Sequence, residues 1–245
     1  MMMKRNCTRQ WYCAVVVISL LVSTSFGVAA QQTSVLHPIG TDLDGWMMRG
    51  YRGASQWTIG KAQINPETPK RLKITAPDGQ NPELINAAKG RTDIFTGAVF
   101  GDCTIELEVM VPRGSNSGIY LMGRYEIQIK DSFSSGKATG PKDMGAICGF
   151  KAADKNAAAE PGAWQKFVIV FKAPRFQKKK RIQPAEFVKV ILNGQVIHEH
   201  VKMTKGSSSG ALKKKEVPRG PLMFQGGLGA VAFRNIKITR EKEQI

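Results

Sequence analysis

Apolar and polar residues alternate with a period of two through much of the chain. Residues 103–111 place apolar side chains at every odd position, and residues 125–130 repeat the alternation over a shorter run. Because successive side chains of a strand point to opposite faces, both segments are predicted to be strands with one buried face. Residues 167–171 are apolar throughout, which is typical of a strand covered on both faces.

A hairpin is predicted between residues 188 and 199. Two alternating segments, 188–192 and 195–199, flank Asn193-Gly194, a pair that favours a type I′ turn. Near the C terminus the apolar residues change from odd to even positions after residue 233. A bulge near Arg234-Asn235 would return them to one face.

Helical signals are weak, and residues 154–160 are the only good short candidate. Many short strands separated by Gly, Pro and Asn turns predict an all-β fold, an antiparallel β-sandwich or jelly roll. The hydrophobic fraction of 42% supplies a real core and argues against disorder. No internal repeat or linker divides the chain, so residues 31–245 are predicted to form a single domain.

Residues 1–30 have the pattern of a secretory signal peptide. A basic start with Lys4, Arg5 and Arg9 precedes an apolar run over residues 11–22, and small residues end the segment at Ala30. We expect cleavage near Ala30 and export to the periplasm or the extracellular space; an uncleaved membrane anchor is the alternative.

The formal net charge of +17 falls to +14 when this segment is removed. Much of the excess lies in two basic insertions, residues 178–181 and 202–215, which are predicted to be exposed loops. Neither run has interleaved aromatic residues, and export separates the protein from most nucleic acid, so nucleic-acid binding is disfavoured. An anionic polysaccharide or envelope surface is the partner that these loops favour.

Cysteine and histidine residues indicate no metal site. The exported chain keeps Cys103 and Cys148, which form either one disulfide or two buried free thiols. No Cys-x-x-Cys pair or His/Cys cluster has the spacing of a zinc site, and no cofactor is indicated. His198 and His200 are two apart in a predicted strand, so we expect both on one solvated edge.

Seven ordered motifs between residues 36 and 240 carry a family resemblance. They are Asp44-Gly45-Trp46, the glycine-containing segment 114–120, the segment 124–133, Trp164-Gln165, residues 173–176, Leu192-Asn193-Gly194, and residues 220–225 followed by 233–236. In this order they resemble the 3-keto-disaccharide hydrolase family, long catalogued as a domain of unknown function. The resemblance implies a concanavalin A-like sandwich whose concave sheet carries a carbohydrate site. It also implies a secreted hydrolase or lyase acting on a 3-keto-glycoside or a related disaccharide.

Glu126 and Gln128 are the central candidates for the site. They lie two apart on a predicted strand, so a carboxylate and an amide project from one face, which suits a hydroxyl-rich ligand. Asp131 would lie on the other face, roughly 16 Å from Glu126 on a regular strand, so a bulge would be needed to bring the carboxylates together. Glu126, Gln128 and Asp131 form the pattern Glu-x-Gln-x-x-Asp, whose spacing is similar to the Glu-x-Asp-x-x-Glu signature of retaining β-glucanases. Alternatively, Asp131 caps the following turn.

For a 3-keto sugar the ketone acidifies the proton on C2, so a base can abstract it and expel the substituent on C1. We expect Glu126 and Asp131 to supply the base and the acid. Polar neighbours would bind the sugar or the enolate oxygen; these candidates are Asn116, Arg124 and Gln128, with Gln225 and Arg234 carried over from the family motifs.

Two departures from the family pattern qualify this expectation. Relatives usually carry Asp and His in the turn after the Leu-Gln pair, but here residues 226–230 contain neither. Cys148 stands where relatives often have Tyr. If the missing His is essential, the alternative is a non-catalytic, lectin-like carbohydrate-binding domain.

Overall fold

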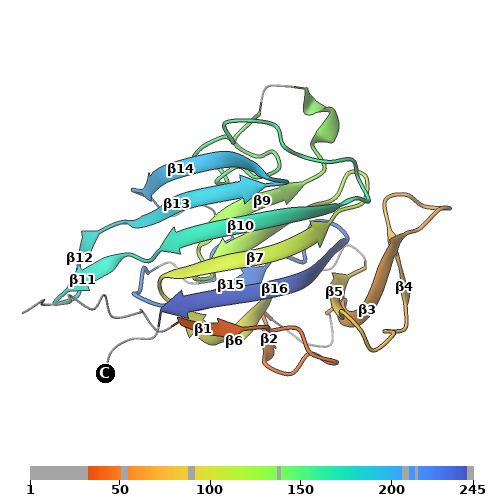
Figure 1. Ribbon diagram of the computed structural model, residues 1–245, viewed down its shortest axis with the longest axis horizontal. Coiled ribbons are helices and arrows are strands. Elements are labelled where there is room, and N and C mark those ends of the chain that lie inside the picture. The colour runs from red at the N-terminus through yellow and green to blue at the C-terminus, as the bar shows by residue number, and fades with distance from the viewer. Residues whose placement is uncertain are drawn as a thin grey trace, which may run out of the picture. The chain divides into compact units, whose positions relative to one another are not determined.

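The computed structural model describes residues 33–50, 55–87, 92–136, 139–205, 210–212 and 215–241. The predicted signal segment lies outside the described residues. Two antiparallel sheets pack face to face, with β14, β13, β10, β7 and β16 in front of β9, β15 and β6 in Figure 1. The all-β sandwich predicted from the alternation is therefore confirmed.

The larger sheet has nine strands. Its order is β14 (Gln195–Met203), β13 (Ala185–Leu192), β10 (Trp164–Lys172), β7 (Cys103–Met110), β16 (Val231–Glu241), β5 (Glu83–Asn86), β3 (Trp57–Ile64) and β4 (Leu72–Thr75), with β1 (Thr33–Leu36) also pairing with β16.

The smaller sheet has five strands, in the order β2 (Trp46–Met48), β6 (Ile94–Phe100), β15 (Gly220–Phe224), β8 (Asn116–Leu121) and β9 (Tyr125–Lys130). A separate two-stranded hairpin joins β11 (Arg175–Gln177) to β12 (Lys180–Gln183). Within the described part of the chain the only helical element is the 3-10 turn η2 (Phe133–Ser135).

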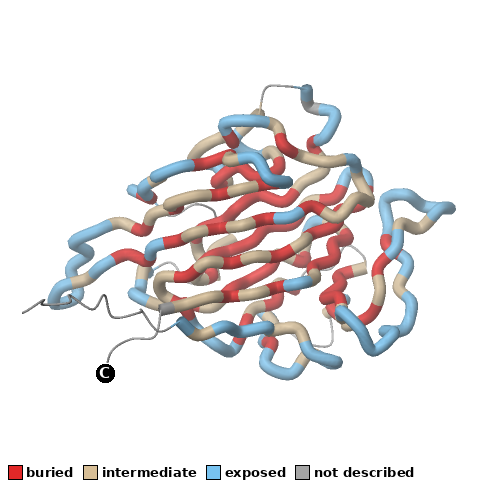
Figure 2. The backbone as a smooth tube through the Cα atoms, in the orientation of Figure 1, coloured by how far each residue is buried: buried red, intermediate tan, exposed pale blue. Residues whose placement is uncertain are grey.

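The core lies between the two sheets, where the inward side chains of both form one apolar cluster. Phe224 of β15 stacks on Phe233 of β16 with ring centroids 4.0 Å apart, and Trp46 packs against Phe224. Burial alternates along β7 and β10, as Figure 2 shows by the red and tan stretches of the tube, whereas β8 and β9 are buried almost throughout. Since successive side chains of a strand point to opposite faces, the residues that join the core cluster identify the inner face of each strand, and the residues between them lie on its outer face.

The predicted hairpin and bulge are both confirmed. Asn193 and Gly194 have φ angles of 49° and 79° between β13 and β14, as a type I′ turn requires. The register of β16 against β7 shifts between Arg234 and Lys237, and Asn235 has a φ angle of 51°. Phe233 and Ile238 are consequently both buried in the core.

The expectation of a helix at residues 154–160 is wrong. The backbone N–H groups of this segment find other acceptors: Asp154 N donates to Ile197 O, Ala158 N to Asn156 Oδ1, and Ala159 N to Gln165 Oε1. Side-chain acceptors offer the backbone an alternative to helical hydrogen bonds, so the segment follows the sheet surface as an irregular loop.

Two expectations about strand faces also need correction. His198 is fully buried, whereas His200 is exposed, because His200 has a φ angle of 51° and interrupts the alternation along β14. In β10 the side chains of Val168 and Val170 are only partly buried, so this strand is covered on one face rather than on both.

Both cysteines outside the first 32 residues are free thiols: Cys103 is buried and Cys148 is half-buried. Of the two alternatives the sequence leaves open, the structure therefore has free thiols. Among the described residues, no helix is long and apolar enough to cross a membrane.

Candidate functional site

The outer face of the five-stranded sheet, which points away from the core, carries two rows of side chains across the strands. The first row follows from the register: Met47 pairs with Phe95, Phe95 with Met223, Met223 with Tyr120, and Tyr120 with Glu126. These five residues belong to five different strands and share one face.

The second row lies two residues further along each strand. The ladder continues past the strand ends, because Arg49 N donates to Asp93 O at 2.9 Å and Gln225 N donates to Gly118 O at 3.0 Å. Gly118 in turn pairs with Gln128. We call the set Arg49, Asp93, Gln225, Gly118 and Gln128 the polar row.

Glu126 leans from the first row over the polar row. A Cβ atom placed on Gly118 would lie 2.5 Å from Glu126 Oε1 and 2.8 Å from the ring of Tyr120, so the carboxylate occupies the space that glycine leaves. The side chain is buried, with a relative exposure of 3%. Glycine at position 118 is therefore part of the geometry that places this carboxylate on the sheet.

Cys148 lies beside the same carboxylate. Burial raises the pKa of the Cys148 thiol to about 12, and the charge of Glu126 and a hydrogen bond to it add to this effect. The thiol is thus held protonated as a hydrogen-bond donor next to Glu126, at the position where relatives often have a tyrosine hydroxyl.

Asp93 supplies a second carboxyl on this face. Burial raises the pKa of the Asp93 carboxyl, although the N–H of Gly226 and the guanidinium of Arg49 oppose the shift. The N–H of Gly226 donates to Asp93 Oδ1 at 3.2 Å, and Arg49 Nη1 lies 3.4 Å from Asp93 Oδ2. The polar row therefore combines a carboxyl whose pKa is raised with a cation beside it.

Amide side chains extend the site toward the far end of β9. Gln128 Nε2 donates to Asn116 Oδ1 at 2.6 Å and to Ser117 O at 3.1 Å. Gln225 Nε2 donates to the Tyr120 hydroxyl at 3.3 Å, while Gln225 Oε1 receives no hydrogen bond from the described residues. This buried acceptor is suited to a ligand hydroxyl.

Two segments border the face. Residues 145–148 add to the free edge of β9, since Gly145 N donates to Gln128 O and Cys148 N to Glu126 O. Gly210 lies against the Tyr120 hydroxyl so closely that a Cβ atom there would overlap it, and its carbonyl accepts from Arg49 Nη1 at 2.6 Å. Tyr120 is consequently buried although it points outward from the sheet.

Asp131 lies at the far end of β9 from Glu126. The register of β8 against β9 shows no bulge, so the carboxylates remain separated along a regular strand by roughly 16 Å. Asp131 Oδ2 accepts a hydrogen bond from Gly114 N at 2.8 Å. The structure therefore does not bring Asp131 to Glu126, and it gives Asp131 a role in fixing the loop that contains Gly114.

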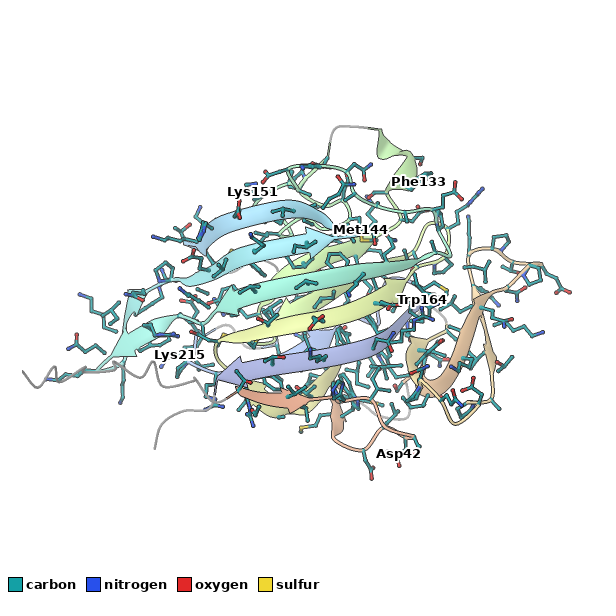
Figure 3. All side chains as sticks on the ribbon, in the orientation of Figure 1. Asp42, Phe133, Met144, Lys151, Trp164 and Lys215 are labelled. Atoms are coloured by element: carbon teal, nitrogen blue, oxygen red, sulfur yellow. The ribbon has the colours of Figure 1, made fainter. Side chains whose placement is uncertain are left out.

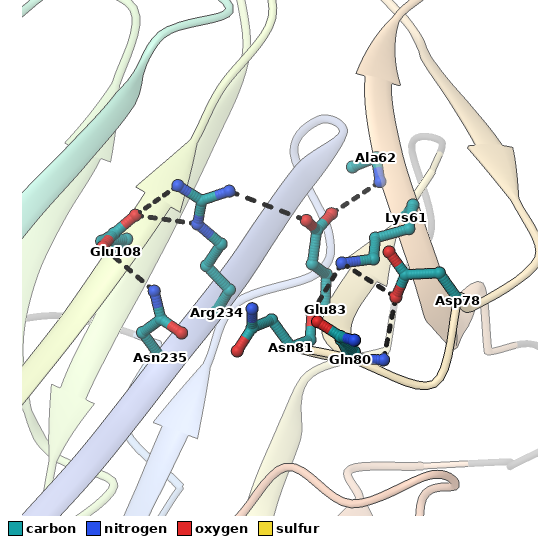
Figure 4. A network of polar contacts seen from close by, with 9 residues as sticks. All are labelled: Lys61, Ala62, Asp78, Gln80, Asn81, Glu83, Glu108, Arg234 and Asn235. Atoms are coloured by element: carbon teal, nitrogen blue, oxygen red, sulfur yellow. Dashed lines mark hydrogen bonds and ion pairs between the residues drawn. The ribbon is translucent and has the colours of Figure 1, made fainter.

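The two candidate arginines lie in different places. Arg124 follows the turn between β8 and β9, and its Nε is 4.0 Å from Glu216 Oε1. Arg234 lies on the outer face of the nine-stranded sheet, where it pairs with Glu108 and Glu83 (Figure 4). Its guanidinium also covers the ring of Trp164. The structure does not bring Arg234 to the face that holds Glu126.

The turn that lacks the family Asp and His is packed tightly against its surroundings. Asn86 Nδ2 donates to Gly226 O and Gly229 O at 3.0 and 2.9 Å. A Cβ atom at Gly226 would overlap Thr92 O, and one at Gly229 would overlap the Ser115 hydroxyl. These two positions therefore exclude any side chain, whereas Leu228 between them is exposed.

Arg49, Asp93 and Tyr120 are functional candidates that sequence reasoning missed. Each occupies a position, in or next to a strand of the smaller sheet, whose side chain points to the outer face. The alternation of the sequence indicates this only when the order of the strands is known. Among the described residues, no group of three His, Cys, Asp or Glu side chains could hold a metal ion.

Comparison with known proteins places this chain in a family. The chain is similar to a candidate glycosyl hydrolase of Parabacteroides distasonis ATCC 8503, with 25% identity, a TM-score of 0.60, and coverage of 82% of this chain and 80% of that one. A second candidate glycosyl hydrolase from the same organism has 16% identity and a TM-score of 0.58, over 85% of this chain and 94% of that chain. No curated protein matches the sequence. Because a family profile matches residues 35–239, the chain belongs to the family of the 3-keto-alpha-glucoside-1,2-lyase-like domain.

Proposed function

We propose that this protein is an exported enzyme that cleaves 3-keto-glycosides on the outer face of the five-stranded sheet. The observation that carries the proposal is the placement of Glu126, Asp93 and Arg49 on one face, with amide side chains between and beside them. The family and the similarity to candidate glycosyl hydrolases support a carbohydrate-active hydrolase or lyase.

The chemistry begins at the C2 proton, which the neighbouring ketone acidifies. Glu126 takes this proton, and the electron pair forms an enolate whose oxygen the Arg49 guanidinium stabilises. The C1–O bond then breaks, and the leaving oxygen receives a proton from Asp93. The products are an enone and the free alcohol; addition of water to the enone gives overall hydrolysis.

The spacing of the two carboxyls suits this division of roles. Asp93 precedes β6, and the Glu126 carboxylate lies over Gly118 of β8, two strands away. Two strand spacings are about 10 Å, which leaves room for a sugar ring between the two groups. Asn116, Gln128 and Gln225 would bind its hydroxyls, and Arg124 borders the site through its turn.

The competing function is a lectin-like module that binds the same sugar without turnover. The absence of Asp and His from residues 226–230 favours it. The raised pKa of Asp93 favours the enzyme, because a carboxyl with a raised pKa holds its proton to higher pH than an ordinary aspartate and is better suited to replace the missing acid.

A substrate panel separates the two functions. Purified protein is incubated with 3-keto-disaccharides and with the corresponding ordinary disaccharides, and free sugar is quantified. We expect turnover of the keto sugars, lost in Glu126→Gln and Asp93→Asn. Asp131→Asn tests the alternative in which Asp131 supplies the second proton. Binding without turnover would support the lectin-like function, and turnover that survives both Glu126→Gln and Asp93→Asn would overturn the assigned site.

The two basic insertions, we further propose, form one surface for an anionic polysaccharide. Arg181 Nη1 lies 2.7 Å from Glu216 Oε2, and Arg181 Nη2 is 3.5 Å from Thr204 O, so the β11–β12 hairpin contacts the second insertion. Figure 3 shows Lys215 at this end of the molecule. Six exposed lysines here make no ion pair with a described residue: Lys178, Lys179, Lys180, Lys202, Lys205 and Lys215.

The hairpin tip adds a second argument. Lys178 and Lys179 have φ angles of 46° and 69°, a conformation that Asn-Gly adopts with less strain. The conformation of the turn therefore does not favour lysine at these two positions, and we attribute both lysines to binding of the anionic ligand.

A salt series tests this surface. We expect binding to polygalacturonate that weakens with added salt, is absent for dextran, and falls in Lys178→Gln/Lys179→Gln/Lys180→Gln. The matched control, Lys70→Gln/Lys73→Gln/Lys142→Gln, removes the same charge elsewhere and should bind like the parent protein. Equal loss in both variants, or tighter binding to duplex DNA, would contradict the proposal.

Sequencing the N terminus of the exported protein tests cleavage near Ala30.

A further inference from the structure

Phe133 is the only exposed large aromatic side chain in the described part of the chain, with a relative exposure of 43%. It projects from η2, directly after the end of the β9 region, and Figure 3 labels it on this turn. Two hollows meet at its ring. One, of about 300 Å³, is also lined by Arg113 and Glu160; the other, of about 350 Å³, is also lined by Asp154 and Lys155.

The turn that presents Phe133 is fixed on both sides. Asp131 N donates to Ser115 O, and Asp131 Oδ2 accepts from Gly114 N. Ser132 is buried, and its hydroxyl accepts from Met144 N at 2.9 Å. Beyond the turn, Asn156 Nδ2 donates to Gly136 O at 2.7 Å. The ring is therefore exposed on an anchored segment and needs no rearrangement to meet a ligand.

The polar groups around the ring are balanced in charge. Arg113 and Glu160 line one hollow and make no ion pair with a described residue, so both remain available to a ligand. Lys155 and Asp154 line the other, and Asp154 also pairs with Lys151. Each hollow thus holds one acid and one base, which suits an uncharged ligand that both donates and accepts hydrogen bonds.

We propose that Phe133 and these two hollows form a binding subsite for an uncharged pyranose ring of an oligosaccharide. One face of a pyranose carries C–H groups with small positive charge, which pack on the negative face of an aromatic ring. The hydroxyls at its rim would bond to Arg113 and Glu160 on one side and to Asp154 and Lys155 on the other. A polyanion would meet Glu160 and Asp154, so this subsite differs in ligand class from the basic surface.

The subsite does not depend on the proposed activity. Phe133 lies beyond the end of β9 opposite to Glu126, and none of the residues that line its hollows belongs to the polar row. It would hold a further unit of a chain, or a separate chain, whether or not the keto sugar is cleaved.

Binding measurements with neutral oligosaccharides test the inference. Cello-, malto-, laminari- and xylo-oligosaccharides are titrated into the purified protein by calorimetry. For at least one series, Phe133→Ala should weaken affinity about tenfold, as for loss of an aromatic anchor. Phe133→Tyr should retain affinity because it keeps the aromatic face, whereas Phe133→Leu should lose it although it stays apolar. Leu228→Ala, a change at another exposed apolar residue, is the matched control and should have no effect.

The outcomes distinguish this subsite from the proposed active site. Binding that persists in Glu126→Gln/Asp93→Asn and is lost in Phe133→Ala supports the subsite even if no turnover is found. Failure of every series to bind the parent protein overturns the subsite, as does full affinity in Phe133→Ala. Full affinity in Phe133→Leu with loss in Phe133→Ala would also overturn it, because the surface would then be a general apolar contact rather than a saccharide platform.

Discussion

The outer faces of the two sheets carry similar residue types in opposite electrostatic arrangements. On the nine-stranded sheet, Glu108 meets Arg234 at 2.7 Å and Asn235 at 3.1 Å, and Glu106 meets Lys237 at 3.0 Å. These side chains are half-exposed and in register across β7 and β16. On the five-stranded sheet, Glu126 is buried beside a glycine, a tyrosine and a thiol, and Asp93 has a raised pKa.

The contrast separates charges that support the fold from charges suited to chemistry. The guanidinium of Arg234 and the Asn235 amide lower the pKa of Glu108 against the effect of its burial, so this carboxylate stays ionised and paired. At Asp93 the effect of burial on the pKa outweighs the opposing effect of the polar partners, so this carboxyl is suited to proton transfer instead. The same residue types therefore have a structural use on one sheet and a chemical use on the other.

Neutralising one carboxylate on each face tests whether the two faces differ in function. Glu126→Gln should lower kcat/KM for a 3-keto-disaccharide by about 1,000-fold, since a positioned base contributes about 100- to 10,000-fold. Glu108→Gln, the matched change on the other face, should leave kcat/KM unchanged. Steady-state kinetics on both variants, with circular dichroism to confirm folding, checks this. Equal losses in the two variants would remove the distinction between the faces.

Asp93→Asn should lower kcat/KM by about 100-fold and change its pH dependence. Asp93 must be protonated to act as the acid, so activity should fall as pH rises through its pKa. Because burial raises that pKa, the fall should occur above the range of an ordinary aspartate, and it should vanish in the Asn variant. A pH profile of kcat/KM measures this; an unchanged alkaline limb would exclude Asp93 as the acid.

Gly118→Ala tests whether the glycine places Glu126. The added Cβ would lie 2.5 Å from Glu126 Oε1 and should displace the carboxylate, which lowers kcat by about 10- to 100-fold. Gly97→Ala is the control, because its Cβ would meet only Gly45 O at 3.4 Å. Kinetics that respond equally to both substitutions would show a general effect on the sheet rather than on Glu126.

Arg234→Met should affect stability and leave activity unchanged. The substitution removes the partner of Glu108 and leaves Glu83, 4% exposed, without the guanidinium 3.9 Å away. We expect a loss of about 2 kcal/mol in the free energy of unfolding, less than for a fully buried pair because Arg234 is partly solvated. Urea unfolding measures the loss. A large fall in kcat/KM at full stability would instead place Arg234 in the active site.

His198 of β14 is fully buried, and its imidazole should make stability depend weakly on pH. Burial lowers the pKa of the His198 imidazole, and Gly145 O lies 2.9 Å from its Nε2. The imidazole of His198 therefore binds a proton more readily in the unfolded chain than in the folded protein. The free energy of unfolding should consequently decrease as pH falls below about 6.5. His198→Gln should reduce this dependence and His200→Gln, at an exposed position, should not. Thermal unfolding between pH 7.5 and 5.5 decides between them.

The local parts of this architecture follow from the sequence. Alternation places Glu126 and Gln128 on one face, the Asn-Gly pair forms the hairpin turn, and the change of parity marks the bulge at Asn235. Each depends on residues close together in the chain, where side-chain period and turn chemistry decide the conformation.

The features of the site that could not be predicted from the sequence depend mainly on how strands far apart in the chain pair with one another. Arg49 and Asp93 carry no motif, and only the order β2-β6-β15-β8-β9 brings them to the face of Glu126. Asp131 stays remote because β9 has no bulge, a detail that the Glu-x-Gln-x-x-Asp spacing does not encode. The loop at 154–160 loses its helix to acceptors outside the segment: Ile197 O, which lies far along the chain, and the side chain of Gln165, six residues beyond Ala159.

Release of deuterium from C2 shows whether Glu126 removes the C2 proton during cleavage. A 3-keto-disaccharide labelled with deuterium at C2 is incubated with the protein, and label entering water is compared with sugar cleaved. We expect one label to be released for each bond cleaved, at a rate about 1,000-fold lower in Glu126→Gln and unchanged in Glu108→Gln. Cleavage with the label retained at C2, or release undiminished in Glu126→Gln, would contradict it.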